Sequence, residues 1–269
     1  SGVGHGSVLF ECNEQFQKQL ETREYLRAAE CTNLLKGVMH QVKYNLIDDY
    51  VQAQMGISYR EFQAGYLNTD DRSGMGINQN LQARFFNLLE GRELGDLLNN
   101  LAISIVAADS DGMQMHTIDL NQGTRMDYSL PYVSLEPGSK ASYDALYDFV
   151  GSLPREKRHD IDQVEGIKAL VYATWRSTVE NIYVGGVPDI YLLQTEGDEP
   201  FKRIEKHDSL LLTEIVRASR HGFISEYQAT GLYELIISGN DFDNSQRRFL
   251  ESAGDRSRDL QLFLRGYDI

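Results

Sequence analysis

A histidine and a tyrosine near the middle of the chain have the side chains best suited to acid–base chemistry. His116 and Tyr128 lie in a stretch of alternating apolar and polar residues, and its preferred register places them opposite each other. A histidine with a hydrogen-bond partner in reach can act as a general base. A core histidine satisfied by the Tyr128 hydroxyl would look the same. We favour that structural explanation and keep His116 and Tyr128 as the candidate catalytic pair.

The same register predicts a charged face on the other side of the sheet. Asp119 is expected to oppose Arg125, and Thr117 to oppose Asp127. Cross-strand pairs of this kind usually stabilise a solvent-exposed sheet face by a few tenths of a kcal/mol. A face that binds a polar substrate would carry the same residues, so Asp119, Arg125 and Asp127 are candidate binding residues.

A second candidate binding pair lies further along the chain. Arg176 and Glu180 are four residues apart in a stretch expected to be helical, so the two side chains share one helix face. They are suited to flank a pocket, and their spacing is equally that of a surface ion pair. The sequence leaves both interpretations open.

Metal and cofactor motifs are incomplete in this sequence. Residues 70–71, 109–112 and 240–244 each resemble a fragment of a calcium loop, but none supplies the full series of ligands. The dipeptide of His159 and Asp160 resembles part of a phosphohydrolase metal site, yet helix capping explains Asp160 better. The sequence contains no phosphate-binding loop, dinucleotide fingerprint or zinc spacing, so we expect no metal and no cofactor.

The first candidate residues depend on a small antiparallel sheet. Two glycine-containing turns divide residues 102–130 into three segments of strand length, which we expect to pair as a three-stranded meander. Ala108 is expected to face Met113, and Leu120 to face Thr124. This register collects one apolar face, made of Ile103, Ile105, Ile118, Leu120, Met126, Tyr128 and Leu130. The opposite face takes Ser104, Thr117, Asp119, Arg125, Asp127 and Ser129.

Helical periodicity accounts for most of the remaining chain. Apolar spacing predicts one or two helices between residues 13 and 55 and another over residues 78–100. Gly56 is expected to end the first helical region in the left-handed conformation, and Ser58 and Glu61 to form a capping box for the next helix.

A strongly amphipathic helix is expected to begin after an N-terminal cap at Asp160. We expect its apolar stripe to lie in the core, across the apolar face of the sheet. That stripe includes Leu170, Val171, Trp175 and Val179. Residues 182–193 resemble further strands that extend the sheet, and residues 208–269 are expected to be helical.

Length and composition favour one mostly helical α+β domain over residues 1–269. The expected parts are a helical N-terminal part (13–100), a central sheet (102–133 with 182–193) and a helical C-terminal part (208–269). The formal charge of -14 argues against nucleic acid as the main partner, and the chain has no apolar run long enough for membrane insertion.

Compartment is only weakly indicated. Cys12 and Cys31 are expected to be free thiols, which favours the cytoplasm. The chain does not begin with Met, so a leader or an upstream domain is left open.

Two function classes remain. The first is a soluble acidic binding or interaction protein whose partner is a protein or a small polar ligand; the absence of catalytic motifs and the 15 tyrosines favour it. The second is a hydrolase or transferase whose Asp, Glu, Tyr and His groups are gathered from distant parts of the chain. A pocket that holds several carboxylates would favour the enzyme, and the sequence does not decide whether the protein is one.

Overall fold

The structure is a computed structural model, and the residues that it describes are 2–3, 6–23, 26–64, 66–67, 75–76, 78–91, 101–109, 112–120, 123–126, 131–135, 139–181, 186–193 and 201–266. Its architecture is α+β and mostly helical, with helices packed on a small antiparallel sheet, as the sequence predicts. Two compact units make up the chain, residues 1–127 and residues 128–269. Whether they fold as the single expected domain stays a prediction.

The sheet of the first unit has the strand order β1-β4-β5-β6, with every neighbouring pair antiparallel. Its strands are β1 (Gly2–Val3), β4 (Ala102–Asp109), β5 (Gly112–Asp119) and β6 (Gly123–Met126). The β4–β5 hairpin has the predicted register, because Ala108 faces Met113 and Ile103 faces Ile118. Strand β1 was not expected from the sequence.

The predicted register of the second hairpin is wrong by two residues. Thr124 faces Ile118 rather than Leu120, and Gly123 faces Asp119. A shift of two residues keeps every side chain on the same face of the sheet, so the apolar pattern does not distinguish the two registers. The two registers differ only in where the loop between β5 and β6 lies, and this loop begins one residue earlier than expected.

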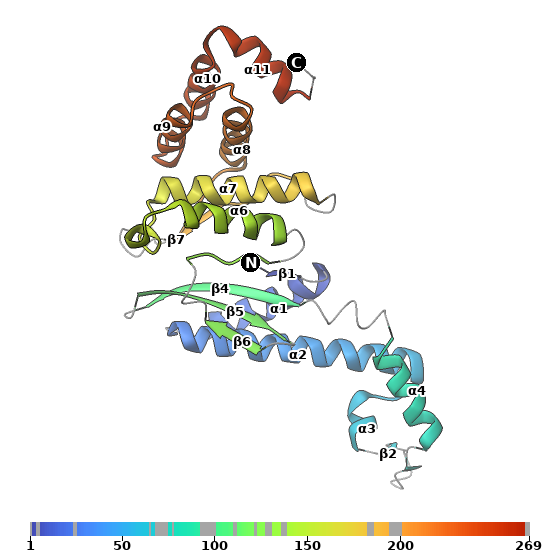
Figure 1. Cartoon of the computed structure of the whole chain (residues 1–269). Coiled ribbons are helices and arrows are strands. Elements are labelled where there is room, and N and C mark those ends of the chain that lie inside the picture. Colours follow the sequence, from blue (N-terminus) through green and yellow to red (C-terminus); the bar gives the residue numbers. More distant parts are fainter. Residues whose placement is uncertain are drawn as a thin grey trace. The chain divides into compact units, whose positions relative to one another are not determined.

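Two helices cover the apolar face of this sheet (Figure 1). Helix α1 (Gly6–Glu21) and helix α2 (Ala28–Met55) are separate, which settles the choice between one helix and two. Their buried side chains pack with those of the sheet; the shared core contains Val8, Cys12, Leu35, Val38, Met39, Val42, Leu101 and Ile118. The sheet face expected to receive the later amphipathic helix is therefore occupied by the N-terminal helices.

Two polar residues on the opposite face of the sheet are buried rather than exposed to solvent. Ser104 and Thr117 are 5% and 3% exposed, and their hydroxyl oxygens lie 2.8 Å apart across the strands. The prediction of a solvent-exposed face is thus wrong at these two positions. Their mutual hydrogen bond lets two short polar side chains be buried without loss of bonding.

The end of α2 and the start of α3 have the predicted caps. Gly56 ends α2 with φ 71° and donates its N–H to Gln52 O, and Ser58 and Glu61 form the expected capping box at 2.8 and 3.1 Å. The elements that follow are α3 (Tyr59–Ala64), β2 (Tyr66–Leu67), β3 (Met75–Gly76) and α4 (Gln79–Leu89). Phe85 of α4 is buried against α2 and α3. The expected helix over residues 78–100 ends at Leu89 in the structure, and residues 92–100 lie outside the described residues.

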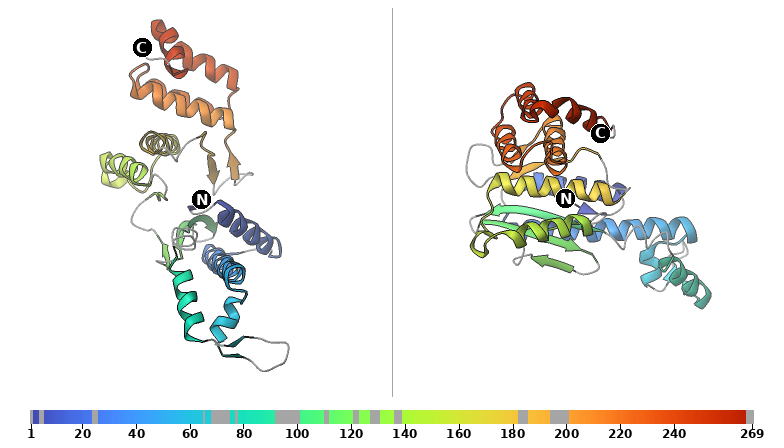
Figure 2. Two further views of the ribbon diagram at one scale, coloured as in Figure 1. Left: turned by 90° about the vertical axis from the view of Figure 1, so that its right-hand side faces the viewer. Right: turned by 45° about the horizontal axis from the view of Figure 1, so that its top comes forward.

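In the second unit, α6 (Ser139–Ser152) and α7 (Gln163–Glu180) run side by side (Figure 2). A short 3₁₀ turn, η1 (Arg155–Lys157), lies between them. The cap of α7 is Asp162 rather than Asp160: its carboxylate accepts the N–H groups of Val164 and Glu165 at 2.9 and 3.3 Å. An N-cap must precede the first helical residue directly, and Asp160 lies two residues too early.

The apolar stripe of α7 differs in part from the prediction. Val171 is buried and Trp175 is partly buried, but Leu170 and Val179 are 50% and 63% exposed. The buried face instead uses Ile167, Ala169, Val171, Ala173 and Ser177. Helix α7 packs on α6 through its alanines and on other helices through Ile167 and Val171. The buried face of the helix is therefore wider than the expected apolar stripe and is rotated relative to it.

Residues 206–264 form four helices, as expected, and one hairpin precedes them among the described residues. The helices are α8 (Lys206–Arg220), α9 (Glu226–Ile237), α10 (Phe242–Ser252) and α11 (Ser257–Leu264), with the 3₁₀ turn η2 (Gly254–Arg256). Strands β7 (Tyr191–Leu193) and β8 (Phe201–Arg203) pair with each other as a separate sheet. The expectation that residues 182–193 extend the central sheet is therefore wrong for β7, because a strand that the sequence did not reveal supplies its partner. No helix within the described ranges has both the length and the apolar character to span a membrane.

Candidate functional site

The predicted catalytic histidine is a buried residue of β5. His116 is 6% exposed and faces Ile105 on β4 and Met126 on β6. Its Nε2 lies 3.3 Å from Oε1 of Gln114, two residues away on the same strand. Tyr128 lies outside the described residues, and the corrected register places Met126 where it was expected. The contacts of His116 are those of a histidine packed in a sheet.

The predicted charged face does not assemble as expected. Asp119 faces Gly123, and Arg125 faces Thr117 rather than Asp119. Asp127 lies outside the described residues, and of Arg125 only the backbone is described. The described residues therefore do not bring the side chains of Asp119, Arg125 and Asp127 together in one binding site.

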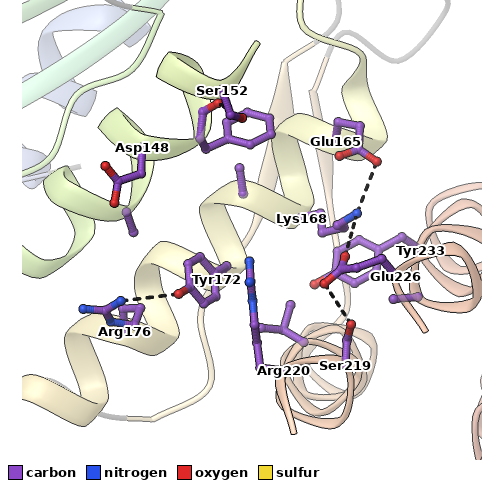
Figure 3. A pocket seen from close by; sticks show the side chains of 15 residues that line it. Asp148, Ser152, Glu165, Lys168, Tyr172, Arg176, Ser219, Arg220, Glu226 and Tyr233 are labelled. Carbon is purple, nitrogen blue, oxygen red and sulfur yellow. Dashed lines mark hydrogen bonds and ion pairs between the residues drawn. The ribbon is translucent and has the colours of Figure 1, made fainter. Parts of the chain in front are cut away.

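A pocket of about 430 Å³ lies among four helices of the second unit, α6, α7, α8 and α9. Figure 3 shows side chains from all four helices around one space. The apolar part of its lining is Ala145, Phe149, Ala169, Val216 and Ala229. The polar part is Asp148, Ser152, Glu165, Lys168, Tyr172, Arg176, Ser219, Arg220, Glu226 and Tyr233.

One of the predicted binding residues lines this pocket. Arg176 donates from Nε to Oε1 of Glu180 at 2.9 Å and from Nη1 to the Tyr172 hydroxyl at 3.4 Å. The hydrogen bond to Tyr172 and then that to Glu180 raise the pKa of Arg176. Glu180 itself does not belong to the pocket lining, so the pair is a helix-surface ion pair that holds Arg176 at the pocket edge.

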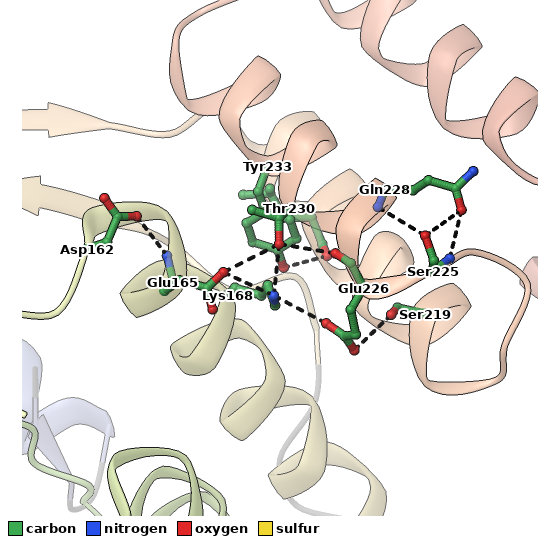
Figure 4. A network of polar contacts seen from close by, with 10 residues as sticks. Asp162, Glu165, Lys168, Ser219, Ser225, Glu226, Gln228, Thr230 and Tyr233 are labelled. Atoms are coloured by element: carbon green, nitrogen blue, oxygen red, sulfur yellow. Dashed lines mark hydrogen bonds and ion pairs between the residues drawn. The ribbon is translucent and has the colours of Figure 1, made fainter. Parts of the chain in front are cut away.

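Lys168 is the centre of a polar network on one wall of the pocket (Figure 4). Its Nζ lies 3.3 Å from Glu165 Oε1, 3.2 Å from Glu226 Oε2 and 3.0 Å from Thr230 Oγ1, and its side chain is only 19% exposed. Ser219 donates to the other carboxylate oxygen of Glu226 at 3.0 Å. The network joins α7, α8 and α9. It therefore holds these three helices together at the pocket wall and keeps the charged groups of that wall in place.

The pKa of Glu226 shows that this network favours the ionised carboxylate. Burial acts to raise the pKa, but the hydrogen bonds from Ser219 and Lys168, with the charges of Lys168 and Arg220, outweigh burial and leave the pKa below its ordinary value. Glu226 is therefore an anion at neutral pH.

An arginine and a tyrosine stack on the neighbouring wall. The guanidinium carbon of Arg220, the last residue of α8, lies 4.1 Å from the centre of the Tyr172 ring on α7. Figure 3 shows the guanidinium extending from α8 into the pocket beside that ring. Such a cation–π contact holds a charged group in place without using its N–H donors.

Tyr233 completes the buried side of the pocket. Its hydroxyl donates to the carbonyl of Leu212 at 2.9 Å, and burial, with a smaller effect of the Glu226 charge, raises its pKa well above the usual value. A phenol held in this way contributes shape rather than a mobile proton.

The sequence analysis missed most of this pocket. Lys168, Tyr172 and Arg176 follow one another at intervals of four residues, which places them on one helix face, and this spacing was the available signal. Nothing local connects them to Arg220 or Glu226, because those residues belong to helices that begin more than 25 residues later.

Neither a metal-binding cluster among the described residues nor a similar known protein assigns a function to this pocket. Among the described residues, no group of three or more His, Cys, Asp or Glu side chains is arranged to hold a metal ion. Comparisons of the chain with protein-family models, with curated proteins and with solved structures found no match.

Proposed function

We propose that the protein binds a small polar ligand in the pocket among α6, α7, α8 and α9. The observation that carries the proposal is the pocket itself, whose volume of about 430 Å³ lies in the range typical of small-molecule sites. Its lining combines five apolar side chains with ten charged or hydroxyl-bearing ones. Apolar area provides affinity in such sites, and the polar groups orient the ligand.

The state of the pocket carboxylates supports binding over catalysis. Glu165 and Glu226 both contact Lys168, so the two carboxylates share one positive charge. A general acid at neutral pH needs a raised carboxyl pKa, and that of Glu226 is lowered. The carboxylates of this wall therefore act as structural partners of the lysine.

A hydrolase or transferase is the second candidate, and one observation favours it. Asp148, Glu165 and Glu226 all line the pocket, which is the accumulation of carboxylates that an acid–base enzyme would show. Turnover of chromogenic ester or phosphate substrates that is lost in Glu226→Gln would favour this alternative. Glu234→Gln is the control, since Glu234 lies exposed on the same helix.

A fragment screen tests the proposed binding. Small polar fragments are screened by ligand-observed NMR against the full chain and against Ser152→Trp, in which an indole enters the pocket from the end of α6. Ser238→Trp is the matched control: each serine is exposed near a helix end and donates its hydroxyl to the carbonyl three residues earlier, at 2.6 and 2.8 Å. We expect hits that Ser152→Trp loses and Ser238→Trp retains. Hits that both variants retain would contradict the proposal.

A further inference from the structure

Arg220 is an exposed residue whose hydrogen-bonding capacity no other described residue uses. The described residues give its guanidinium no hydrogen bond and no ion pair; its contact is the face of Tyr172, 4.1 Å from the guanidinium carbon. A guanidinium carries five N–H donors in one plane, and stacking on a ring leaves the edges of that plane open. The group is thus held in a defined orientation with its donors available to the pocket.

The other two cations of the pocket lining are already engaged. Lys168 binds Glu165, Glu226 and Thr230, and Arg176 binds Glu180. Glu226 is the carboxylate whose pKa responds to the charge of Arg220, but its oxygens accept from Lys168 and Ser219. Positive charge with unused donors is therefore concentrated at Arg220.

The open edge of Arg220 matches an acceptor group that has two oxygen atoms side by side. Two oxygens of a carboxylate or a phosphate fit the edge of a guanidinium as a pair of parallel hydrogen bonds. The apolar part of the pocket, which includes Phe149 and Val216, suits a hydrocarbon or aromatic body attached to such a group.

We infer that the ligand of this pocket is a small organic anion. Its carboxylate or phosphate binds the open edge of Arg220, and its apolar body contacts the apolar part of the lining, which includes Phe149 of α6 and Val216 of α8. This inference rests on the proposed function, since it names the class of ligand that the same pocket takes. It adds that the anionic group is required for binding.

Four related probes test the inference by isothermal titration calorimetry. Benzoate and phenyl phosphate share an aromatic body and carry the two anionic groups, while benzyl alcohol is neutral and benzylamine is a cation. We expect at least one of the two anions to bind at millimolar concentrations or below and the other two probes to bind at least about tenfold more weakly, the ratio that one charge-assisted hydrogen bond gives. The comparison of benzoate with phenyl phosphate shows which acid group is preferred.

Matched arginine variants show where the anion binds. Arg220→Gln should weaken the binding of the preferred anion at least about tenfold. Arg217→Gln is the control, because Arg217 lies on the same helix and also stacks on a ring, that of Phe263 at 5.1 Å, yet does not line the pocket. Both variants change the net charge equally, so a general electrostatic effect would appear in both.

The outcomes separate this inference from the proposed function. Anion binding that Arg220→Gln leaves unchanged overturns the inference. Binding of benzyl alcohol or benzylamine that Ser152→Trp abolishes, without stronger binding of an anion, also overturns it while the pocket remains the ligand site. Absence of binding by all four probes overturns it as well, and the fragment screen then decides the proposed function alone.

Discussion

Arg220 at the end of α8 and Tyr172 on α7 form a stacked pair, with the guanidinium carbon 4.1 Å from the ring centre. The two residues are 48 positions apart in the chain. Their contact joins two helices at the pocket and keeps a positive charge exposed to it. The Tyr172 ring therefore holds the guanidinium of Arg220 in place, in addition to lining the pocket.

The stacked pair makes a measurable contribution to stability. Tyr172→Leu removes the aromatic face, and we expect a loss of about 0.5–1 kcal/mol in the free energy of unfolding that depends on Arg220. A double-mutant cycle with Arg220→Gln measures this coupling by chemical denaturation. A coupling energy indistinguishable from zero would mean that the two groups are neighbours without stacking.

Burial on α8 distinguishes two leucines that are two positions apart. Leu212 is fully buried in the core of the second unit, whereas Leu210 is 45% exposed. Leu212→Ala should cost about 2–5 kcal/mol of stability, the range for core leucines. Leu210→Ala should stay within about 0.5 kcal/mol, as surface substitutions do. Equal losses in the two variants would contradict the orientation of α8.

Glu226 should stabilise the fold in a pH-dependent way. Its pKa is lower in the folded chain than in the unfolded chain, so its contribution is present above the unfolded value of about 4.3 and is lost as pH falls through the folded value. Glu226→Gln should therefore be less stable than the wild type at neutral pH, and the difference should shrink in acid. Denaturant unfolding at a series of pH values measures it. Glu234→Gln is the control, and a difference for Glu226→Gln that grows in acid would reverse the sign of the argument.

The two thiols should differ in reactivity. Burial, followed by the charge of Glu11, raises the pKa of Cys12 to about 11, and its side chain is fully enclosed by α1, α2 and the sheet. Cys31 is partly exposed. Because the thiolate is the reactive form, a thiol reagent at mildly alkaline pH should label Cys31 first and Cys12 only in denaturant. Rapid labelling of Cys12 in the native protein would contradict the packing of α1.

Local sequence signals predict the parts of the fold that local chemistry determines. Gly56 ends α2 in the left-handed conformation, and Ser58 with Glu61 forms the capping box of α3. The β4–β5 hairpin follows from its glycine turn and its alternating residues. In each case the interacting groups lie within a few residues of one another, so the sequence contains the whole interaction.

Elsewhere the determining contacts are distant in the chain. Leu170 is exposed because α7 turns other residues toward α6 and α8, and β7 finds its partner in β8 rather than in the central sheet. The pocket depends on contacts such as that of Lys168 with Thr230, which are 62 residues apart. Helical spacing groups Lys168, Tyr172 and Arg176, but only the packing of the helices brings Arg220 to them.

The most direct test of the ligand site is the position of a bound ligand. Intermolecular nuclear Overhauser effects between an aromatic hit of the fragment screen and the protein report protons that lie within a few ångströms of each other. We expect contacts with the rings of Phe149 and Tyr172 and with the methyl group of Ala169, all of which line the pocket. Contacts confined to exposed aromatic residues elsewhere, such as the stacked Tyr191 and Phe201 of the β7–β8 hairpin, would contradict the assignment of the pocket as the functional site.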